Sequence, residues 1–213
     1  MSVVTLALSK GRILEESLPL LGRAGLAPAE DFAQSRKLIV DSAEAGVKLV
    51  VIRAQDVPTY VQFGAADLGF AGKDVLMEHG GDGLEEVCDL KIARCRMMVA
   101  EPKALADRDD PRRWRRLRIA TKYPRITRAH FAAKGVQTEI IKLYGSMELA
   151  PLSGLSDRIV DLVDTGNTLR ANGLVEVEHI ADVSARLIVN RASLRVKTTR
   201  LKDVIERIER AVA

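Results

Sequence analysis

Short apolar runs alternate with helical patterns between residues 117 and 163, and this alternation constrains the fold more than any other feature of the sequence. The apolar runs predict strands at residues 119–121, 139–143 and 159–163. A helix is predicted at residues 126–134 between the first two strands, and another begins near Gly145. Strands separated by helices in this way form β-α-β units with parallel strands. The sequence therefore predicts an α/β fold.

The last of these strands leads into a polar turn at residues 165–168, Thr-Gly-Asn-Thr, before a predicted helix. Hydroxyls, an amide and backbone N–H groups at the positive end of a helix suit a phosphate, and Gly166 allows a close approach. Asp161 and Asp164 precede the turn, where carboxylates can hold ribose hydroxyls or a divalent cation that accompanies a pyrophosphate. The alternative is an ordinary turn in which one of the threonines caps the helix.

A second turn of this kind opens the chain, where Ser9-Lys10-Gly11-Arg12 joins a predicted strand at residues 3–8 to an amphipathic helix that ends at Gly25. Ligands bind at the carboxyl ends of strands in open α/β sheets. Because the helix dipole disfavours cations at an N-terminus, Lys10 and Arg12 are candidates for binding phosphate. The alternative is a solvated basic pair.

Two further candidates stand at strand ends. Residues 38–40 and 47–52 flank a six-residue loop and predict a β-hairpin that Arg53 closes. Asp67 begins a short buried strand that ends at Gly72. Their position alone makes Arg53 and Asp67 candidate site residues.

The remaining patterns predict strands at residues 92–100, 175–180 and 185–190 and an amphipathic helix at 201–212. In the first of these, Arg94 and Arg96 are expected to alternate outward. No low-complexity linker or internal repeat interrupts the chain. We predict two α/β lobes, the first formed by residues 1–93 with 181–213 and the second by residues 94–180.

Composition restricts the class of protein. Of the 213 residues, 47% are hydrophobic, which is enough for a packed core without disulfides. Cys88 and Cys95 show no metal-binding spacing and are expected to be buried and reduced. No basic leader precedes the first predicted strand, and no apolar run approaches the roughly 20 residues of a membrane span. We therefore expect a cytoplasmic protein without a membrane partner.

The strongest charge cluster lies at residues 106–118, where arginines from Arg112 to Arg118 surround Trp114. Such a cluster can indicate RNA binding, but nearby aspartates balance it, and only 4% of residues are aromatic. Few side chains can therefore stack on bases. The net charge of +4 mildly favours anionic partners, and we expect no nucleic-acid partner.

Six blocks of sequence, taken together and in order, resemble the ATP phosphoribosyltransferases that open histidine biosynthesis. The blocks are residues 9–12, 64–69, 72–74, 120–124, 143–151 and 161–169. The resemblance covers essentially the whole chain. It implies two periplasmic-binding-protein-like lobes, each a mostly parallel sheet flanked by helices, with the site between them. It also implies transfer of phosphoribosyl from phosphoribosyl pyrophosphate to N1 of the ATP adenine, with Mg²⁺ carried mainly by the pyrophosphate.

The resemblance also assigns residues to roles. The catalytic set is Lys10, Arg12, Glu148 and Asp161. The phosphoribosyl pyrophosphate loop comprises Asp164, Thr165, Gly166, Asn167, Thr168 and Leu169. Arg53, Asp67, Leu68 and Gly69 are assigned to the nucleotide. Adenine N1 needs positioning more than a strong base, so no general base is named.

The helix at residues 201–213 is the last segment, whereas long members of the family continue into a histidine-binding regulatory domain. The chain is therefore expected to resemble the short form, in which a partner similar to histidyl-tRNA synthetase supplies activity and feedback. We expect a homodimer within such a hetero-oligomer. A two-lobed small-molecule-sensing module without catalysis is the alternative, but it requires neither Asp161 before the polar turn nor the basic loop at residues 9–12.

Overall fold

The computed structural model describes residues 3–32, 37–106 and 117–213, which form two compact units. The first unit contains residues up to 94 and from 184 onward, and the second contains residues 95–183. The sequence analysis placed these two divisions after residues 93 and 180. Most of the arginine cluster at residues 106–118 lies outside the described residues.

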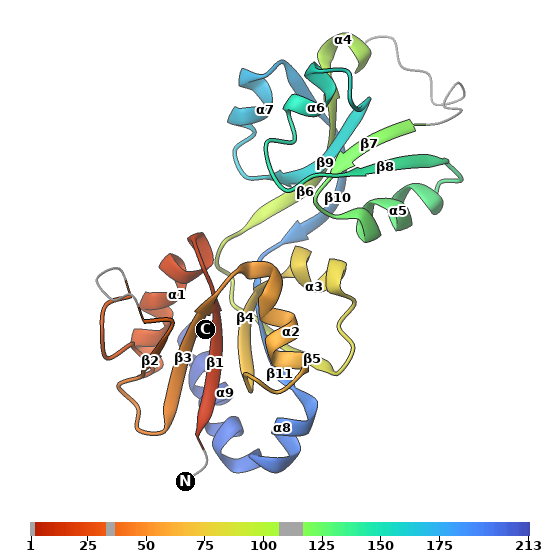
Figure 1. Cartoon of the computed structure of the whole chain (residues 1–213). Coiled ribbons are helices and arrows are strands. Elements are labelled where there is room, and N and C mark those ends of the chain that lie inside the picture. The colour runs from red at the N-terminus through yellow and green to blue at the C-terminus, as the bar shows by residue number, and fades with distance from the viewer. Residues whose placement is uncertain (1–2, 33–36, 107–116) are drawn as a thin grey trace. The chain divides into compact units, whose positions relative to one another are not determined.

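The sheet of the first unit has six strands in the order β2-β3-β1-β4-β11-β5 (Figure 1). The strands are β1 (Val4–Ser9), β2 (Ile39–Asp41), β3 (Val47–Ile52), β4 (Leu68–Gly72), β5 (Leu84–Asp89) and β11 (Ala185–Asn190). Strands β3, β1 and β4 run parallel, while β2, β11 and β5 add antiparallel pairings. The carboxyl ends of β3, β1 and β4 therefore share one edge of the sheet.

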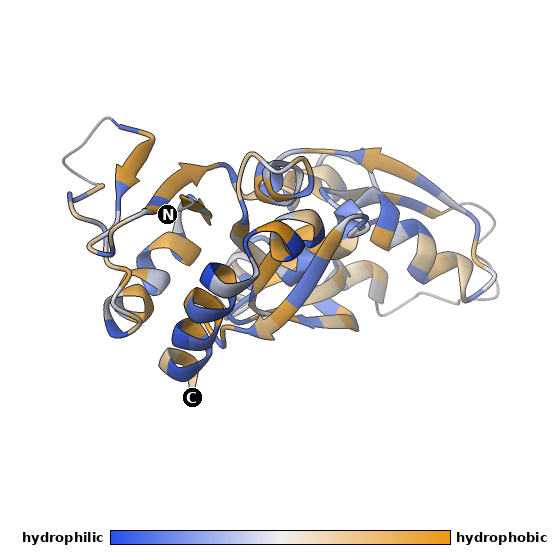
Figure 2. Cartoon of the chain, turned by 90° about the horizontal axis from the view of Figure 1, so that it is seen from below, coloured by the Kyte–Doolittle hydropathy of each residue, from blue (hydrophilic) through white to orange (hydrophobic). Residues whose placement is uncertain are grey.

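Helices pack against this sheet, and buried apolar residues in the described part of the unit form two separate clusters. The elements are α1 (Arg12–Arg23), the 3₁₀ turn η1 (Ala54–Asp56), α2 (Val57–Gln62), α3 (Lys73–His79), α8 (Arg191–Val196) and α9 (Thr198–Val212). The terminal helix was predicted because Leu201, Val204 and Ile208 recur at helical spacing, and all three are buried. Figure 2 shows polar and apolar residues alternating along this helix toward the C-terminus.

The second unit holds a five-stranded sheet in the order β10-β6-β9-β7-β8 (Figure 1). The strands are β6 (Cys95–Pro102), β7 (Leu117–Thr121), β8 (Thr138–Lys142), β9 (Arg158–Val163) and β10 (Leu174–Val183). The helices are α4 (Lys103–Ala106), α5 (Pro124–Ala132), α6 (Leu149–Leu152) and α7 (Asn167–Ala171). Strands β9, β7 and β8 are parallel, and their β-α-β connections are those predicted.

The prediction of two α/β units with helix-flanked sheets is confirmed, but both sheets are mixed. Among the described strands, two of five pairings in the first sheet and two of four in the second are parallel. The parallel pairings lie where helices connect the strands. Part of the antiparallel pairing comes from β10 and β11, because β10 continues directly into β11 at Ser184 with no helix between them. A strand that returns without a crossover helix pairs antiparallel with its neighbour.

Two local predictions need correction. Cys88 and Cys95 are unbridged but only half-buried. Arg94 precedes β6, so the two arginines do not lie on one strand, and Arg96 on β6 forms an ion pair with Glu176 at 2.8 Å. Within the described part of the chain, no helix combines the length and apolar character that crossing a membrane requires.

Candidate active site

The second unit contains a cavity of about 210 Å³ at the end of β9. Its lining consists of residues 161–169 and Glu148, which precedes α6. Val163 and Leu169 are buried in the core of this unit and anchor the two ends of the turn. The structure therefore brings together Glu148, Asp161 and the whole predicted phosphoribosyl pyrophosphate loop.

Gly166 fixes the shape of this loop. Its φ is +72°, and a Cβ there would lie 2.8 Å from Glu176 Oε1 and 3.0 Å from an Nη atom of Arg170. Arg170 Nη2 donates to the Thr165 carbonyl at 2.9 Å and to Asn167 Oδ1 at 2.6 Å. Arg170 thus holds both sides of the turn. The sequence analysis missed this residue, although its helical spacing from Asn167 was a usable signal.

The loop presents hydrogen-bond donors to the cavity. The first backbone N–H groups of a helix have no intrahelical partner, and in α7 these belong to Asn167, Thr168 and Leu169. Asn167 N–H makes only a long bond of 3.4 Å to Thr165 Oγ1. Thr168 is exposed and adds a hydroxyl. Such a set of donors matches the oxygens of a phosphate.

The acidic side of the cavity is partly ordered. Asp161 Oδ1 accepts a hydrogen bond from Leu162 N at 2.8 Å, which orients the carboxylate at the end of β9. Among the described residues, no group of three or more His, Cys, Asp or Glu side chains is arranged to hold a metal ion.

Three predicted cationic residues lie at the same edge of the sheet in the first unit. Lys10 and Arg12 follow β1, and Arg53 follows β3, its parallel neighbour. Lys10 N donates to the Ile52 carbonyl at 2.8 Å, which places the two loops side by side. Lys10, Arg12 and Arg53 are all exposed. A cationic edge at strand carboxyl ends is therefore present as predicted.

Arg12 is held by a residue that the sequence analysis did not single out. Its Nε donates to Glu16 Oε1 at 2.6 Å, and Glu16 Oε2 accepts from Ala93 N at 2.8 Å. The hydrogen bond from Ala93, followed by that from Arg12, lowers the pKa of the Glu16 carboxyl below its ordinary value.

Asp67 does not lie with these cations. The register pairs Leu6 with Leu68, so Asp67 lies beside Thr5 near the amino end of β1, whereas Lys10 follows the carboxyl end. Asp67 is 3% exposed, and its Oδ2 accepts from Thr5 N at 2.9 Å and from Lys197 Nζ at 2.8 Å. These contacts give Asp67 a structural role, and its position does not support the predicted nucleotide contact.

Leu68 and Gly69 also serve the fold. Leu68 is fully buried in the first apolar cluster. A Cβ on Gly69 would lie 2.8 Å from side-chain atoms of both Val57 and Val61, so the glycine allows α2 to pack closely on β4. Neither residue lies at the cationic edge, and neither position supports a nucleotide contact.

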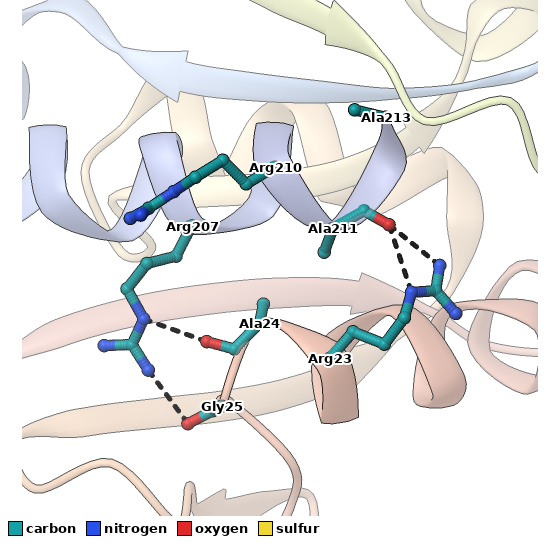
Figure 3. Close-up of a pocket in the computed structure, with 7 residues that line it drawn as sticks. All are labelled: Arg23, Ala24, Gly25, Arg207, Arg210, Ala211 and Ala213. Atoms are coloured by element: carbon teal, nitrogen blue, oxygen red, sulfur yellow. Dashed lines mark hydrogen bonds between the residues drawn. The ribbon is translucent and has the colours of Figure 1, made fainter.

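A larger cavity of about 670 Å³ lies between α1 and α9, and three arginines line it (Figure 3). Arg207 donates to the carbonyls of Ala24 and Gly25, and Arg23 donates to that of Ala211. Both helices end at this cavity, so their last carbonyl groups place negative partial charge beside it. Arg23 and Arg207 neutralise that charge, and the cavity is not a convincing anion site.

Comparison with known proteins decides the family. The sequence model described as "HisG: ATP phosphoribosyltransferase" matches residues 53–210. The chain belongs to the ATP phosphoribosyltransferase family. It is 59% identical over 209 residues to the ATP phosphoribosyltransferase of Acidithiobacillus ferrooxidans, covering 98% of this chain and 97% of that protein. It is 60% identical over 209 residues to that of Chromobacterium violaceum, covering 98% of both.

Solved structures agree with this assignment. The ATP phosphoribosyl transferase (HisG:HisZ) complex from Thermotoga maritima contains a chain with a TM-score of 0.85 and 34% identity, covering 99% of this chain and 98% of that one. The periplasmic VFT2 domain of Bordetella pertussis BvgS has a TM-score of 0.61 at 13% identity, covering 99% of this chain and 88% of that one. The second likeness shows the fold alone and confirms its periplasmic-binding-protein-like character. The family assignment confirms that the chain is a phosphoribosyltransferase, and a sensing module without catalysis is not favoured.

Proposed function

We propose that this ATP phosphoribosyltransferase transfers phosphoribosyl from phosphoribosyl pyrophosphate to N1 of the ATP adenine, as the first step of histidine biosynthesis. The observation that carries the proposal is that Glu148, Asp161 and the loop at residues 164–169 line the same cavity. It lies in a chain about as long as its relatives and 59–60% identical to them.

The loop binds the 5-phosphate of the ribose in this proposal. Donors from α7 and the hydroxyls of Thr165 and Thr168 supply the hydrogen bonds, and Gly166 allows the phosphate to approach the backbone. Arg170 holds the turn in shape before the substrate arrives. Binding energy at the phosphate then positions C1 of the ribose for attack.

In the reaction, the lone pair of adenine N1 forms a bond to C1 of the ribose. The bond from C1 to the pyrophosphate oxygen breaks, and its electron pair leaves with pyrophosphate. Positive charge develops on the ribose and negative charge on the leaving group, so the transition state is stabilised by carboxylates near the sugar and cations near the pyrophosphate. Glu148 and Asp161 supply the carboxylates, and Lys10, Arg12 and Arg53 bind substrate phosphates.

We propose that Mg²⁺ enters with the pyrophosphate group of the substrate. Mg²⁺ in such sites is held by substrate phosphates and one or two carboxylates. Glu148 and Asp161 line the same cavity, so either side chain fits the role of such a ligand. These residues would hold the metal beside the leaving group, where it neutralises developing charge.

We further propose that the chain works with a separate regulatory subunit of the HisZ kind, similar to histidyl-tRNA synthetase, as a homodimer within a hetero-oligomer. The Thermotoga maritima complex of HisG with HisZ supports this, because its HisG-like chain matches nearly all of the present chain. The biosynthetic role of the family supports a cytoplasmic location. Turnover measured with and without the partner across a histidine titration tests the proposal, and full, histidine-inhibited activity of the isolated chain would refute it.

Substitution of Thr168 by Val tests the site directly. It removes one exposed hydroxyl at nearly constant volume, and a hydrogen bond to a charged group contributes roughly 1.5–3 kcal/mol, so affinity for phosphoribosyl pyrophosphate should fall about tenfold or more. Thr138→Val, at the start of β8 in the same unit, is the matched control. Calorimetry with and without Mg²⁺ provides the measurement, and equal affinities of the two variants would refute the loop assignment.

A further inference from the structure

Glu16 connects two distant parts of the first unit. It lies one helical turn after Arg12 on α1, and one carboxylate oxygen accepts from Arg12 Nε at 2.6 Å. The other oxygen accepts from the backbone N–H of Ala93 at 2.8 Å. A surface ion pair at this helical spacing contributes little by itself. The second contact, 77 residues away in the sequence, sets Glu16 apart.

The segment around Ala93 has an unusual backbone. Lys91 has a φ of +58° and Ala93 a φ of +51°, which non-glycine residues rarely adopt. Such conformations persist where surrounding contacts hold them. Asp89 Oδ1 accepts from Lys91 N at 2.8 Å, and Glu16 accepts from Ala93 N at the same distance. Glu16 is therefore one of the side chains that stabilise this segment.

The segment precedes the place where the chain leaves the first unit, after residue 94. It also contacts the returning chain, because Ala185 N donates to the Ile92 carbonyl at 3.0 Å and Leu90 N donates to the Ala185 carbonyl at 2.9 Å. The chain re-enters the first unit at residue 184. The backbone that Glu16 holds is thus adjacent in the structure to both connections between the units.

We propose that Glu16 is a positioning residue that orients Arg12 for substrate phosphate and couples its engagement to the backbone at Ala93. The inference rests on the proposed function, in which Arg12 binds phosphate. The Arg12 side chain is 49% exposed, and its bond to Glu16 restricts a long, flexible group before the ligand arrives. A phosphate that engages Arg12 shares the guanidinium with the carboxylate without displacing it, so the bond from Arg12 to Glu16 weakens and Glu16 becomes a stronger acceptor for Ala93 N–H.

The test compares wild type with Glu16→Gln, Glu15→Gln and Arg12→Met. Glu15 is the matched control, because it is exposed on the same turn of α1 and its substitution removes the same charge. Calorimetry measures the affinity for ATP and for inorganic pyrophosphate. Hydrogen exchange measured by mass spectrometry follows the peptide that contains Ala93, with and without each ligand.

We expect Glu16→Gln to weaken binding about threefold to tenfold relative to Glu15→Gln, the effect of leaving one long side chain unrestrained. Exchange at Ala93 should become about tenfold faster, because its partner is no longer charged. In wild type and Glu15→Gln the ligand should slow exchange at Ala93, and in Glu16→Gln this response should be lost.

The outcomes separate this inference from the function on which it rests. If Arg12→Met weakens binding but Glu16→Gln binds like Glu15→Gln, only the inference is overturned, and faster exchange at Ala93 would then make Glu16 purely structural. An unchanged exchange response to ligand in Glu16→Gln also overturns it. If wild type binds neither ligand, or Arg12→Met binds like wild type, the phosphate role of Arg12 fails and the inference with it.

Discussion

Substitution of Gly166 by Ala tests whether the geometry of the loop matters for binding. The glycine has a φ of +72°, and an added Cβ would lie 2.8 Å from Glu176 Oε1 and 3.0 Å from Arg170 Nη1. The left-handed conformation alone costs a non-glycine residue about 1–2 kcal/mol. Both crowded atoms are ends of flexible side chains that can move, but Arg170 then loses its contacts with Thr165 and Asn167.

Gly173→Ala separates the two effects. Gly173 also has a left-handed φ, +69°, but a Cβ added there would meet nothing within 4 Å, so this variant reports backbone strain alone. We expect a loss of about 1 kcal/mol in the free energy of unfolding for Gly173→Ala and about 2 kcal/mol for Gly166→Ala. For a protein of this size, each kcal/mol lowers Tm by about 2–4 °C.

Urea unfolding followed by circular dichroism measures these losses, and calorimetry measures the affinity for phosphoribosyl pyrophosphate. Only Gly166→Ala should weaken binding, because only there does the methyl group crowd Arg170, whose hydrogen bonds hold the turn. If the two variants lose equal stability, the crowding argument is wrong. If both bind the substrate as tightly as wild type, the cavity is not its binding site.

Three other predictions concern buried and half-buried groups. Arg158→Met leaves the buried carboxylate of Glu101 without its ion-pair partner and should lower the free energy of unfolding by about 3–5 kcal/mol. By contrast, loss of the partly exposed ion pair in Arg118→Met should cost less than about 1 kcal/mol. Asp67→Ala should destabilise the protein while ATP affinity stays unchanged, and a selective loss of affinity would restore its nucleotide role. Burial raises the pKa of Cys88 to about 11, so at pH 8 maleimide should label it at least about tenfold more slowly in the folded protein than in urea. Because folding raises this pKa, the associated stability is present below the ordinary thiol value and lost as pH rises toward 11.

The fold was predictable where the signal is local. The strands at residues 117–163, the hairpin and the terminal helix each carry their own periodicity or turn, and all are present. Strand β5 was missed because Glu85 and Glu86 follow one another and break the alternation at an edge of the sheet. Strand direction was mispredicted for a different reason. The direction of a strand within its sheet depends on the distant strand with which it pairs. The sequence near β11 does not show that β11 pairs with β4 and β5.

The site shows the same distinction. The loop at residues 164–169 was predictable because its glycine, hydroxyls and preceding acid are contiguous in the sequence, and the structure keeps them around one cavity. Asp67 was also predicted at a strand end, but it lies at the amino end of β4 rather than at the carboxyl end, where ligands bind. Its partner Lys197 is 130 residues away, so nothing near Asp67 in the sequence reveals that it faces the edge opposite to Lys10.

The distribution of charge supports the proposal that the reaction uses residues from more than one part of the chain. The described residues that line the loop cavity include three carboxylates, those of Glu148, Asp161 and Asp164, and no lysine or arginine. Arg170 is nearby but its guanidinium is bonded to the loop itself. Backbone N–H groups can stabilise one phosphate, yet a pyrophosphate beside three acids requires further positive charge. Mg²⁺ carried by the substrate and the cationic edge of the first unit are the two sources in the proposed reaction. A carboxylate that does not hold Mg²⁺ can then stabilise the positive charge that develops on the ribose.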